Sequence, residues 1–326
     1  MRVLSFVKDG RVRLGLHTAA GVVDVAAVAS AAASAGAAGP IGQSVGRLLG
    51  AEFGRLLAGT VLPSTMEELI SQGQEGLDCL RRLDDALSQL PYGELRGVGV
   101  LLDEETIKYA PVVARPEKIL CIGLNYVSHI EETRSRTDLP KYPEVFSVAG
   151  NALAAHKQPI KLPPTAEQYD YEAELVIVMG KECSMVSEGE ALEYVFGYTC
   201  GNDISARDLQ KRTTQWFLGK SLDGFAPVGP CVATAGSIDA GNLGISMRRG
   251  GTTVQSSNTR NLIFGCAYLV SYLSRYLTLR PGDLIFTGTP SGVILGMPQE
   301  ERRWLRPGET LTVSIEGIGE LVNTMV

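Results

Sequence analysis

Three acidic side chains near the middle of the chain have the types and spacing of a metal site. Glu172 and Glu174 stand two positions apart, at the start of an apolar run that ends at Gly180. Because side chains of a β-strand alternate between its faces, both carboxylates are expected on one face. A second strand-like run, residues 194–200, is followed closely by Asp203. Carboxylates this close repel each other unless a cation lies between them, and oxygen ligands suit Mg²⁺ or Mn²⁺.

The pair Glu172 and Glu174, taken alone, favours a simpler interpretation, in which both residues form the solvated face of an edge strand. Asp203 and the motifs described below make the metal site the preferred interpretation.

His129 and Glu132 could form a general base. They are three positions apart, so on a helical turn they lie on the same side. A carboxylate beside an imidazole fixes its tautomer and raises its basicity. An isolated pattern of this kind is more often the solvated start of a helix with an incidental ion pair. The polar residues 134–141 that follow are expected to order over a bound ligand.

Two further segments have residue types that could bind an anion. Lys220 follows Gly219 among apolar residues, a context in which a lysine can turn inward; the alternative is a surface lysine with a buried stem. Residues 284–293 predict a strand that runs into a Gly/Thr loop, whose N–H groups and hydroxyls suit a carboxylate. No Gly-Lys-Ser/Thr follows, so this loop is not a phosphate-binding P-loop.

The elements that must position these groups are expected to form two domains. We expect a small α+β domain over residues 1–110, a proline-containing linker over 111–117 and a catalytic domain over 118–326. The first domain is predicted to begin with a three-strand meander, residues 3–7, 11–17 and 22–25. An Ala-rich tract follows over residues 25–40, and amphipathic helices are predicted over residues 65–90. His17, at the end of a predicted strand, is interpreted as structural. A further helix is predicted over residues 261–277.

Composition limits the classes of function. The chain has 326 residues and a net charge of −6 without a Lys/Arg run, which argues against a nucleic-acid-binding surface. Its six cysteines include no C-x-x-C pair, as expected of reduced thiols in a cytoplasmic protein. The start of the sequence does not match a signal peptide, and the Ala-rich tract is too weakly apolar to span a membrane.

Five motifs together resemble the fumarylacetoacetate hydrolase family, especially its two-domain bacterial-type members similar to oxaloacetate decarboxylases and acylpyruvate hydrolases. They are residues 122–129, 171–175, 202–210, 219–223 and 281–290. The resemblance implies an α+β, mainly β fold: a mixed β-sandwich roll with a small α+β N-terminal domain, usually as a homodimer. It also implies Mg²⁺ or Mn²⁺ bound by Glu172, Glu174 and Asp203, with His129 and Glu132 on a lid. Fumarylacetoacetate hydrolase itself has a further metal-binding aspartate, where this chain reads Gly123-Leu124-Asn125.

The function expected from the resemblance is cleavage of a C–C bond in a small 2-oxo acid through a metal-stabilised pyruvate enolate. Lys220, Arg207 and Gln210 would donate to substrate oxygens, and Gly288 with Thr289 would hold a carboxylate. His129, oriented by Glu132, would activate water in acylpyruvate or fumarylpyruvate hydrolysis, or handle protons in oxaloacetate decarboxylation. Two alternatives stay open: an isomerase of a hydroxymuconate-type 2-oxo dienoic acid, and a non-catalytic protein that binds a metabolite.

Overall fold

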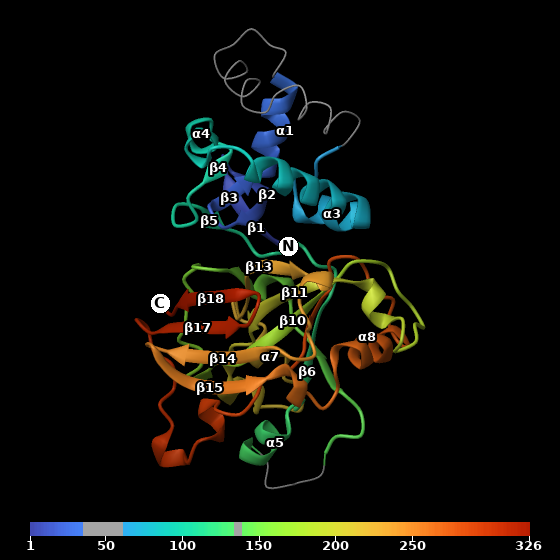
Figure 1. Ribbon diagram of the computed structural model, residues 1–326. Helices are drawn as coiled ribbons and strands as arrows, with labels where there is room; N and C mark the ends of the chain where they lie inside the picture. The colour runs from blue at the N-terminus through green and yellow to red at the C-terminus, as the bar shows by residue number, and fades with distance from the viewer. Residues whose placement is uncertain (35–60, 134–138) are drawn as a thin grey trace. The chain divides into compact units, whose positions relative to one another are not determined.

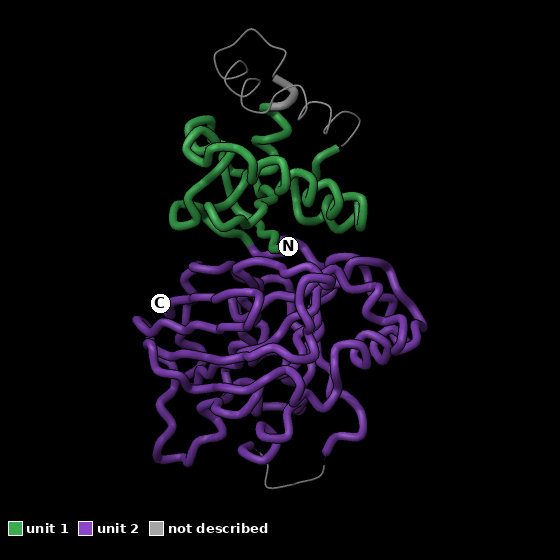
Figure 2. The backbone as a smooth tube through the Cα atoms, viewed as in Figure 1, with its two compact units in different colours: residues 1–110 green, residues 111–326 purple. Residues whose placement is uncertain are grey.

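The computed structural model describes residues 1–34, 61–133 and 139–326. The chain divides into two compact units, residues 1–110 and 111–326 (Figure 2). Residues 111–117, expected as a linker, are grouped with the second unit. The remainder of the Ala-rich tract after Ser34 lies outside the described residues, as do residues 134–138 of the predicted lid.

The first unit contains the predicted antiparallel meander, extended by two short strands. Its strands are β1 Arg2–Lys8, β2 Arg11–Thr18, β3 Gly21–Asp24, β4 Leu101–Leu102 and β5 Lys108–Tyr109. β4 pairs with β3 and β5 pairs with β1. The helices are α1 Val25–Ser34, α3 Met66–Ser88 and α4 Tyr92–Gly97. The α3 backbone is interrupted at Gly73, where φ is 57°.

The second unit is built on a mixed sheet whose strands follow the order β13-β11-β10-β16-β6-β7, with β8 beside β13. These strands are β6 Ile119–Gly123, β7 Glu144–Ser147, β8 Leu153–Ala155, β10 Ala173–Met179, β11 Val195–Asn202, β13 Ala226–Thr234 and β16 Leu284–Phe286. Every residue of β10 is buried, in keeping with its central place and continuous apolar sequence. β10 runs antiparallel to β11 and β16, whereas β16 and β6 are parallel.

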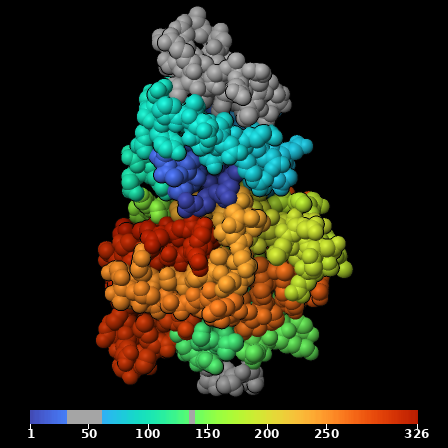
Figure 3. Space-filling view, viewed as in Figure 1, coloured from blue at the N-terminus to red at the C-terminus, as the bar shows by residue number. Residues whose placement is uncertain are grey.

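A second antiparallel sheet packs against the first. Its strands are β14 Gly244–Arg249, β15 Thr252–Asn258, β17 Thr310–Ile315 and β18 Gly319–Thr324. β14 and β17 contact β10, and β18 contacts β13. The four strands lie side by side in Figure 1 and form an orange and red surface in Figure 3. The unit is therefore a β-sandwich, and the mainly β prediction is confirmed.

Short helices connect the strands of the second unit and carry much of its polar chemistry. The α-helices are α5 Val127–Thr133, α6 Arg207–Gln210, α7 Phe217–Lys220 and α8 Cys266–Ser274. A two-strand ladder pairs β9 Tyr169–Asp170 with β12 Ser205–Ala206. The 3₁₀ turns are η1 Gly150–Ala152, η2 Ala191–Tyr194, η3 Ala235–Ser237, η4 Thr259–Asn261, η5 Ile294–Gly296 and η6 Gln299–Glu301.

The helix predicted over residues 261–277 is shorter, because its first residues bond elsewhere. The side chain of Asn125 accepts the Phe264 N–H and donates to the Phe264 carbonyl, while the Asn125 carbonyl accepts the Ile263 N–H. The helix begins only after these contacts, at Cys266. All six cysteines are buried thiols, and no helix in the described part of the chain has the length and apolarity needed to cross a bilayer.

Candidate active site

A cavity of about 230 Å³ lies in the second unit and brings the sequence motifs together. Its lining includes the predicted residues His129, Glu172, Glu174, Asp203, Arg207, Gln210, Lys220 and Thr289. Apolar side chains, among them Phe146 and Trp216, form another part of the wall, and their rings meet edge to face. The cavity therefore combines an acidic cluster, an imidazole and an aromatic surface.

The acidic triad, defined as Glu172, Glu174 and Asp203, is positioned by two neighbouring strands. Glu174 lies in β10 and Glu172 immediately precedes that strand, so the two side chains share a face. Asp203 follows β11, and its N–H donates to the Glu172 carbonyl over 2.9 Å. Carboxylate oxygens of the three residues lie within 4.8 Å of one another, and all three residues are buried.

Lys220 and Arg207 compensate part of this negative charge. The Lys220 ammonium lies 2.6 Å from a carboxylate oxygen of Glu172 and 2.6 Å from one of Asp203. Arg207 donates to the other oxygen of Glu172, to Asp170 and to the Gln210 side-chain oxygen. Of the two interpretations of Lys220, the inward-facing one agrees with its burial. Its ammonium contacts triad carboxylates, a role that the sequence did not indicate.

The three carboxyl groups differ in proton affinity because their surroundings differ. Burial disfavours the charged form of Glu172, but the charges of Arg207 and Lys220 outweigh it and lower its pKa to about 2. Burial and the charges of Asp203 and Glu172 raise the pKa of Glu174 well above its ordinary value. Burial, together with the Glu172 charge, raises the pKa of Asp203 to about 6 despite the opposing Lys220 ammonium.

The triad has the donor set of a site for a hard divalent cation. It offers only carboxylate oxygens, which Mg²⁺ and Mn²⁺ prefer. Asp203 Oδ1 is buried and has no hydrogen-bond partner among the described residues. A buried acceptor without a partner is costly, and a cation would satisfy it. The residues present therefore fit a divalent ion.

The His129–Glu132 dyad is formed within α5. The distance from His129 Nδ1 to Glu132 Oε1 is 2.8 Å, and Glu132 Oε2 accepts the Gly292 N–H at 2.8 Å. Gly296 leaves room for this carboxylate, since a Cβ there would lie 2.5 Å from Glu132 Cδ. With Nδ1 bonded to Glu132, Nε2 is the ring nitrogen left to meet a substrate.

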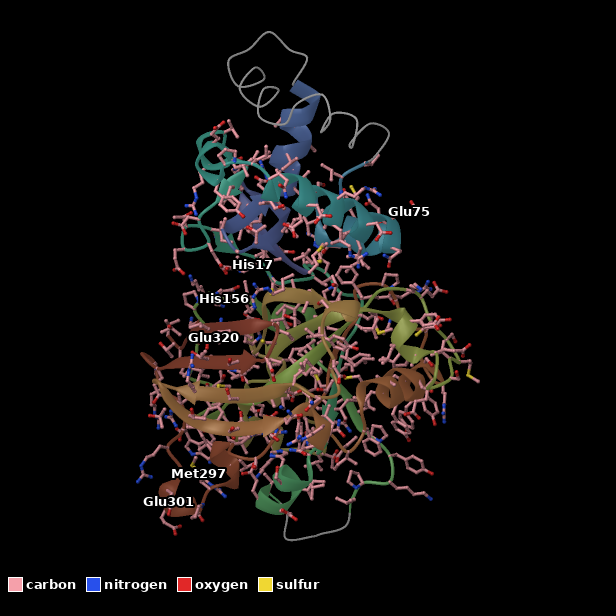
Figure 4. The ribbon with its side chains drawn as sticks, viewed as in Figure 1. His17, Glu75, His156, Met297, Glu301 and Glu320 are labelled. Atoms are coloured by element: carbon pink, nitrogen blue, oxygen red, sulfur yellow. The ribbon has the colours of Figure 1, made fainter. Side chains whose placement is uncertain are left out.

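The other two histidines have structural contacts elsewhere, and both are labelled in Figure 4. His17 lies 3.0 Å from Glu104 within the first unit, in keeping with its structural interpretation. His156 Nδ1 accepts the Val322 N–H at 3.0 Å. His129 is thus the histidine of this chain that lines the cavity.

The predicted substrate-binding residues of the Gly/Thr loop make protein contacts in this structure. The Gly288 N–H donates to Glu174 over 2.7 Å. The Thr289 hydroxyl donates to the Ala173 carbonyl and accepts from Gln255. These groups hold the triad's strand in place, and their contact with substrate stays a prediction.

Asp170, Asn202 and Asn125 have positioning contacts that sequence reasoning missed. Asp170 is fully buried, holds Arg207, and accepts the N–H groups of Ile294 and Leu295. Asn202 accepts the Glu172 N–H. Asn125 also donates to the Thr287 carbonyl. The alternation Asp170-x-Glu172-x-Glu174 was a signal for Asp170; the two asparagines showed none beyond their place in the motifs.

A family model and curated relatives match the part of the chain that contains this site. The family model described as fumarylacetoacetate (FAA) hydrolase C-terminal matches residues 118–326. The fumarylacetoacetate hydrolase domain-containing protein 2 homolog of Dictyostelium discoideum is 44% identical over 227 residues, which are 66% of this chain and 73% of that protein. The mitochondrial oxaloacetate tautomerase Fahd2a of Rattus norvegicus is 37% identical over 267 residues, 81% of this chain and 80% of that protein.

Solved structures give the same result. Fumarylacetoacetate hydrolase from Exiguobacterium antarcticum has a TM-score of 0.71 at 28% identity, covering 100% of this chain and 99% of its own. Fumarylpyruvate hydrolase from Pseudomonas aeruginosa, solved with Mn²⁺ and pyruvate, has a TM-score of 0.59 at 34% identity, covering 65% and 90%. The 5-carboxymethyl-2-hydroxymuconate delta-isomerase from Mycobacterium smegmatis has a TM-score of 0.57 at 36% identity, covering 65% and 79%. The chain belongs to the fumarylacetoacetate hydrolase family.

Proposed function

We propose that this protein is an enzyme that moves a proton at C3 of a small 2-oxo acid, and that keto–enol tautomerisation of oxaloacetate is its first candidate reaction. The observation that carries the proposal is that His129, hydrogen-bonded to Glu132, and the acidic triad line one cavity. The rat relative's name, oxaloacetate tautomerase, supports the choice of substrate. The motifs alone predicted bond cleavage, whereas tautomerisation needs neither water nor a leaving group.

The roles of the residues follow from their positions. Mg²⁺ or Mn²⁺ bound by Glu172, Glu174 and Asp203 would act as a Lewis acid toward the 2-oxo group. His129 Nε2 takes the proton from C3 of the keto acid, and the electrons of the broken C–H bond form the C2–C3 double bond. The same proton then passes to the C2 oxygen, giving the enol and restoring neutral His129. Glu132 keeps the imidazole oriented through both transfers.

The aromatic wall of the cavity and Arg207 support this chemistry in two ways: the wall closes one side of the cavity, and Arg207 keeps a proposed cation ligand charged. Trp216 packs over Gly123, where a Cβ would lie 2.6 Å from the indole, and so closes one side of the cavity. Arg207 keeps Glu172 ionised, which preserves one of the proposed cation ligands. A cavity of about 230 Å³ suits a small acid of oxaloacetate's size.

The direct test follows enol-oxaloacetate by its ultraviolet absorbance with Mg²⁺ or Mn²⁺ present. We expect the wild-type protein to speed the approach to equilibrium, and His129→Asn or EDTA to remove most of that acceleration. A wild-type rate equal to that of buffer would reject the tautomerase proposal.

C–C bond cleavage is the second candidate, supported by likeness to the Mn²⁺- and pyruvate-bound fumarylpyruvate hydrolase. In that reaction His129 would activate water for attack on an acyl carbonyl; in oxaloacetate decarboxylation it would only move protons. Release of pyruvate from fumarylpyruvate, acetylpyruvate or oxaloacetate would separate these outcomes.

Turnover of a hydroxymuconate-type acid would instead support an isomerase, as in the Mycobacterium smegmatis neighbour. Turnover of none would leave a metabolite-binding protein. The homodimer and the cytoplasmic location stay predictions.

A further inference from the structure

Lys211 lies at the mouth of the candidate active site. It lines the same cavity as the acidic triad, but its side chain is exposed whereas the triad is buried. It directly follows α6, and its N–H donates to the Arg207 carbonyl over 3.0 Å, which fixes its backbone. A cationic residue therefore both lines the cavity and meets solvent.

The other strong cations of the cavity already have anionic partners. Arg207 bonds Asp170 and Glu172, and Lys220 bonds Glu172 and Asp203. In the described part of the chain, no carboxylate forms an ion pair with Lys211. Lys211 is thus the cavity lysine or arginine that is left to meet an anion from solution.

The surroundings of Lys211 are positively charged. Partial burial lowers the pKa of Lys211, and the charges of Arg207 and Arg302 lower it further against the opposing charge of Asp170. Arg302 is held in place by a hydrogen bond from its Nε to the Met297 carbonyl at 2.9 Å. Met297 and Glu301 are labelled in Figure 4, and Arg302 directly follows Glu301 in the chain. Such a place attracts an anion and raises its local concentration.

Charge balance indicates which anion would bind there. Asp170 offsets Arg207, and the three acids of the triad are offset by Lys220 together with a divalent cation. A substrate with a second carboxylate brings one more negative charge than a monocarboxylic acid. That charge has Lys211 as its available partner among the described lysines and arginines that line the cavity.

We propose that Lys211 binds the second carboxylate of a dicarboxylic 2-oxo acid and so selects dicarboxylic over monocarboxylic substrates. The inference rests on the proposed function for the site and names its substrate class. It makes Lys211 a specificity residue at the mouth of the cavity, apart from the proton-transfer step at His129.

The test compares Lys211→Met with the wild-type protein on two tautomerisable acids, oxaloacetate and the monocarboxylic phenylpyruvate, at saturating Mg²⁺. We expect KM for oxaloacetate to rise about tenfold, as for loss of one charged contact, with kcat and the phenylpyruvate constants changed less than about twofold. Lys211→Arg should retain most of the oxaloacetate affinity. Lys161→Met, at an exposed lysine outside the cavity, is the matched control. Equal changes for both acids, or none for either, would overturn the proposal.

A binding measurement separates failure of this inference from failure of the proposed function. Malate and lactate differ by one carboxylate and cannot enolise, so calorimetry with Mg²⁺ reports affinity without turnover. We expect the wild-type preference for malate over lactate to fall about tenfold in Lys211→Met. An unchanged preference would reject the role of Lys211 even if tautomerase activity is found. A lost preference would support that role even if the wild-type protein turns over neither acid.

Discussion

His129 Nδ1 and Glu132 Oε1 lie 2.8 Å apart on one turn of α5, and the second oxygen of Glu132 is fixed by the Gly292 N–H. This relationship orients the imidazole before any substrate arrives. We predict that His129→Asn lowers kcat by about 10²–10⁴-fold, the usual contribution of a positioned general base, and that Glu132→Gln lowers it less. Steady-state kinetics with circular dichroism as a folding control measures both. Equal activity of His129→Asn and wild type would remove His129 from the mechanism.

Gly296 has no side chain, which leaves room for the Glu132 carboxylate. An added Cβ would lie 2.5 Å from Glu132 Cδ, so Gly296→Ala must displace that carboxylate. We predict a loss of kcat comparable to that of Glu132→Gln, with the fold retained. Gly189→Ala is the matched control, because a Cβ at Gly189 meets nothing within 4 Å. If Gly296→Ala kept full activity, the exact position of Glu132 would be unimportant for turnover.

Lys220 stabilises the protein when no divalent cation is bound. Its removal in Lys220→Met leaves Glu172 and Asp203 buried without this partner, which we expect to cost about 3–5 kcal/mol of unfolding free energy in EDTA. Because the ammonium repels a cation at the triad, the variant should also bind Mn²⁺ more tightly than wild type does. Denaturant unfolding and calorimetry measure the two effects. Weaker Mn²⁺ binding by Lys220→Met would show that Lys220 does not compete with the ion.

The triad makes cation stabilisation depend on pH. Burial and the Glu172 charge raise the pKa of folded Asp203 from 3.8 to about 6. A raised pKa favours folding at low pH, so this contribution is lost as pH rises through about 6. Glu172, with a pKa lowered to about 2, changes little above about pH 5.

In EDTA, the Asp203 contribution to the melting temperature should therefore fall between about pH 4 and about pH 6, and the rise in melting temperature on adding Mn²⁺ should grow over the same range. Asp203→Asn isolates this contribution, because the melting temperature of the variant in EDTA should depend less on pH than that of the wild type. A Mn²⁺ effect that shrinks with rising pH would contradict the assigned direction.

Local sequence patterns predicted much of the candidate site. Strand alternation placed Glu172 and Glu174 on one face, and the structure directs both into the cavity. Helical spacing predicted that His129 and Glu132 would meet, and they do. These relationships span two or three residues, which is the range over which backbone geometry alone decides direction.

Contacts between distant segments could not be read from the sequence. Lys220 bonds Glu172 across 48 positions, and the Gly288 N–H bonds Glu174 across 114. Such pairs depend on strand order and register, which leave no local pattern. The sequence therefore indicated that Lys220 could meet an anion, but not that the anion was the triad itself. The shortened α8 has the same cause, because Asn125 bonds residues 263 and 264 from another part of the chain.

Exchange of the C3 protons of a 2-oxo acid in D₂O, followed by NMR, tests the central claim most directly, because it detects proton removal whatever reaction follows. With Mg²⁺ and the wild-type protein, C3 of oxaloacetate should incorporate deuterium faster than in buffer, and His129→Asn and EDTA should each abolish the acceleration. Exchange at the buffer rate, or exchange that His129→Asn leaves unchanged, would contradict the account.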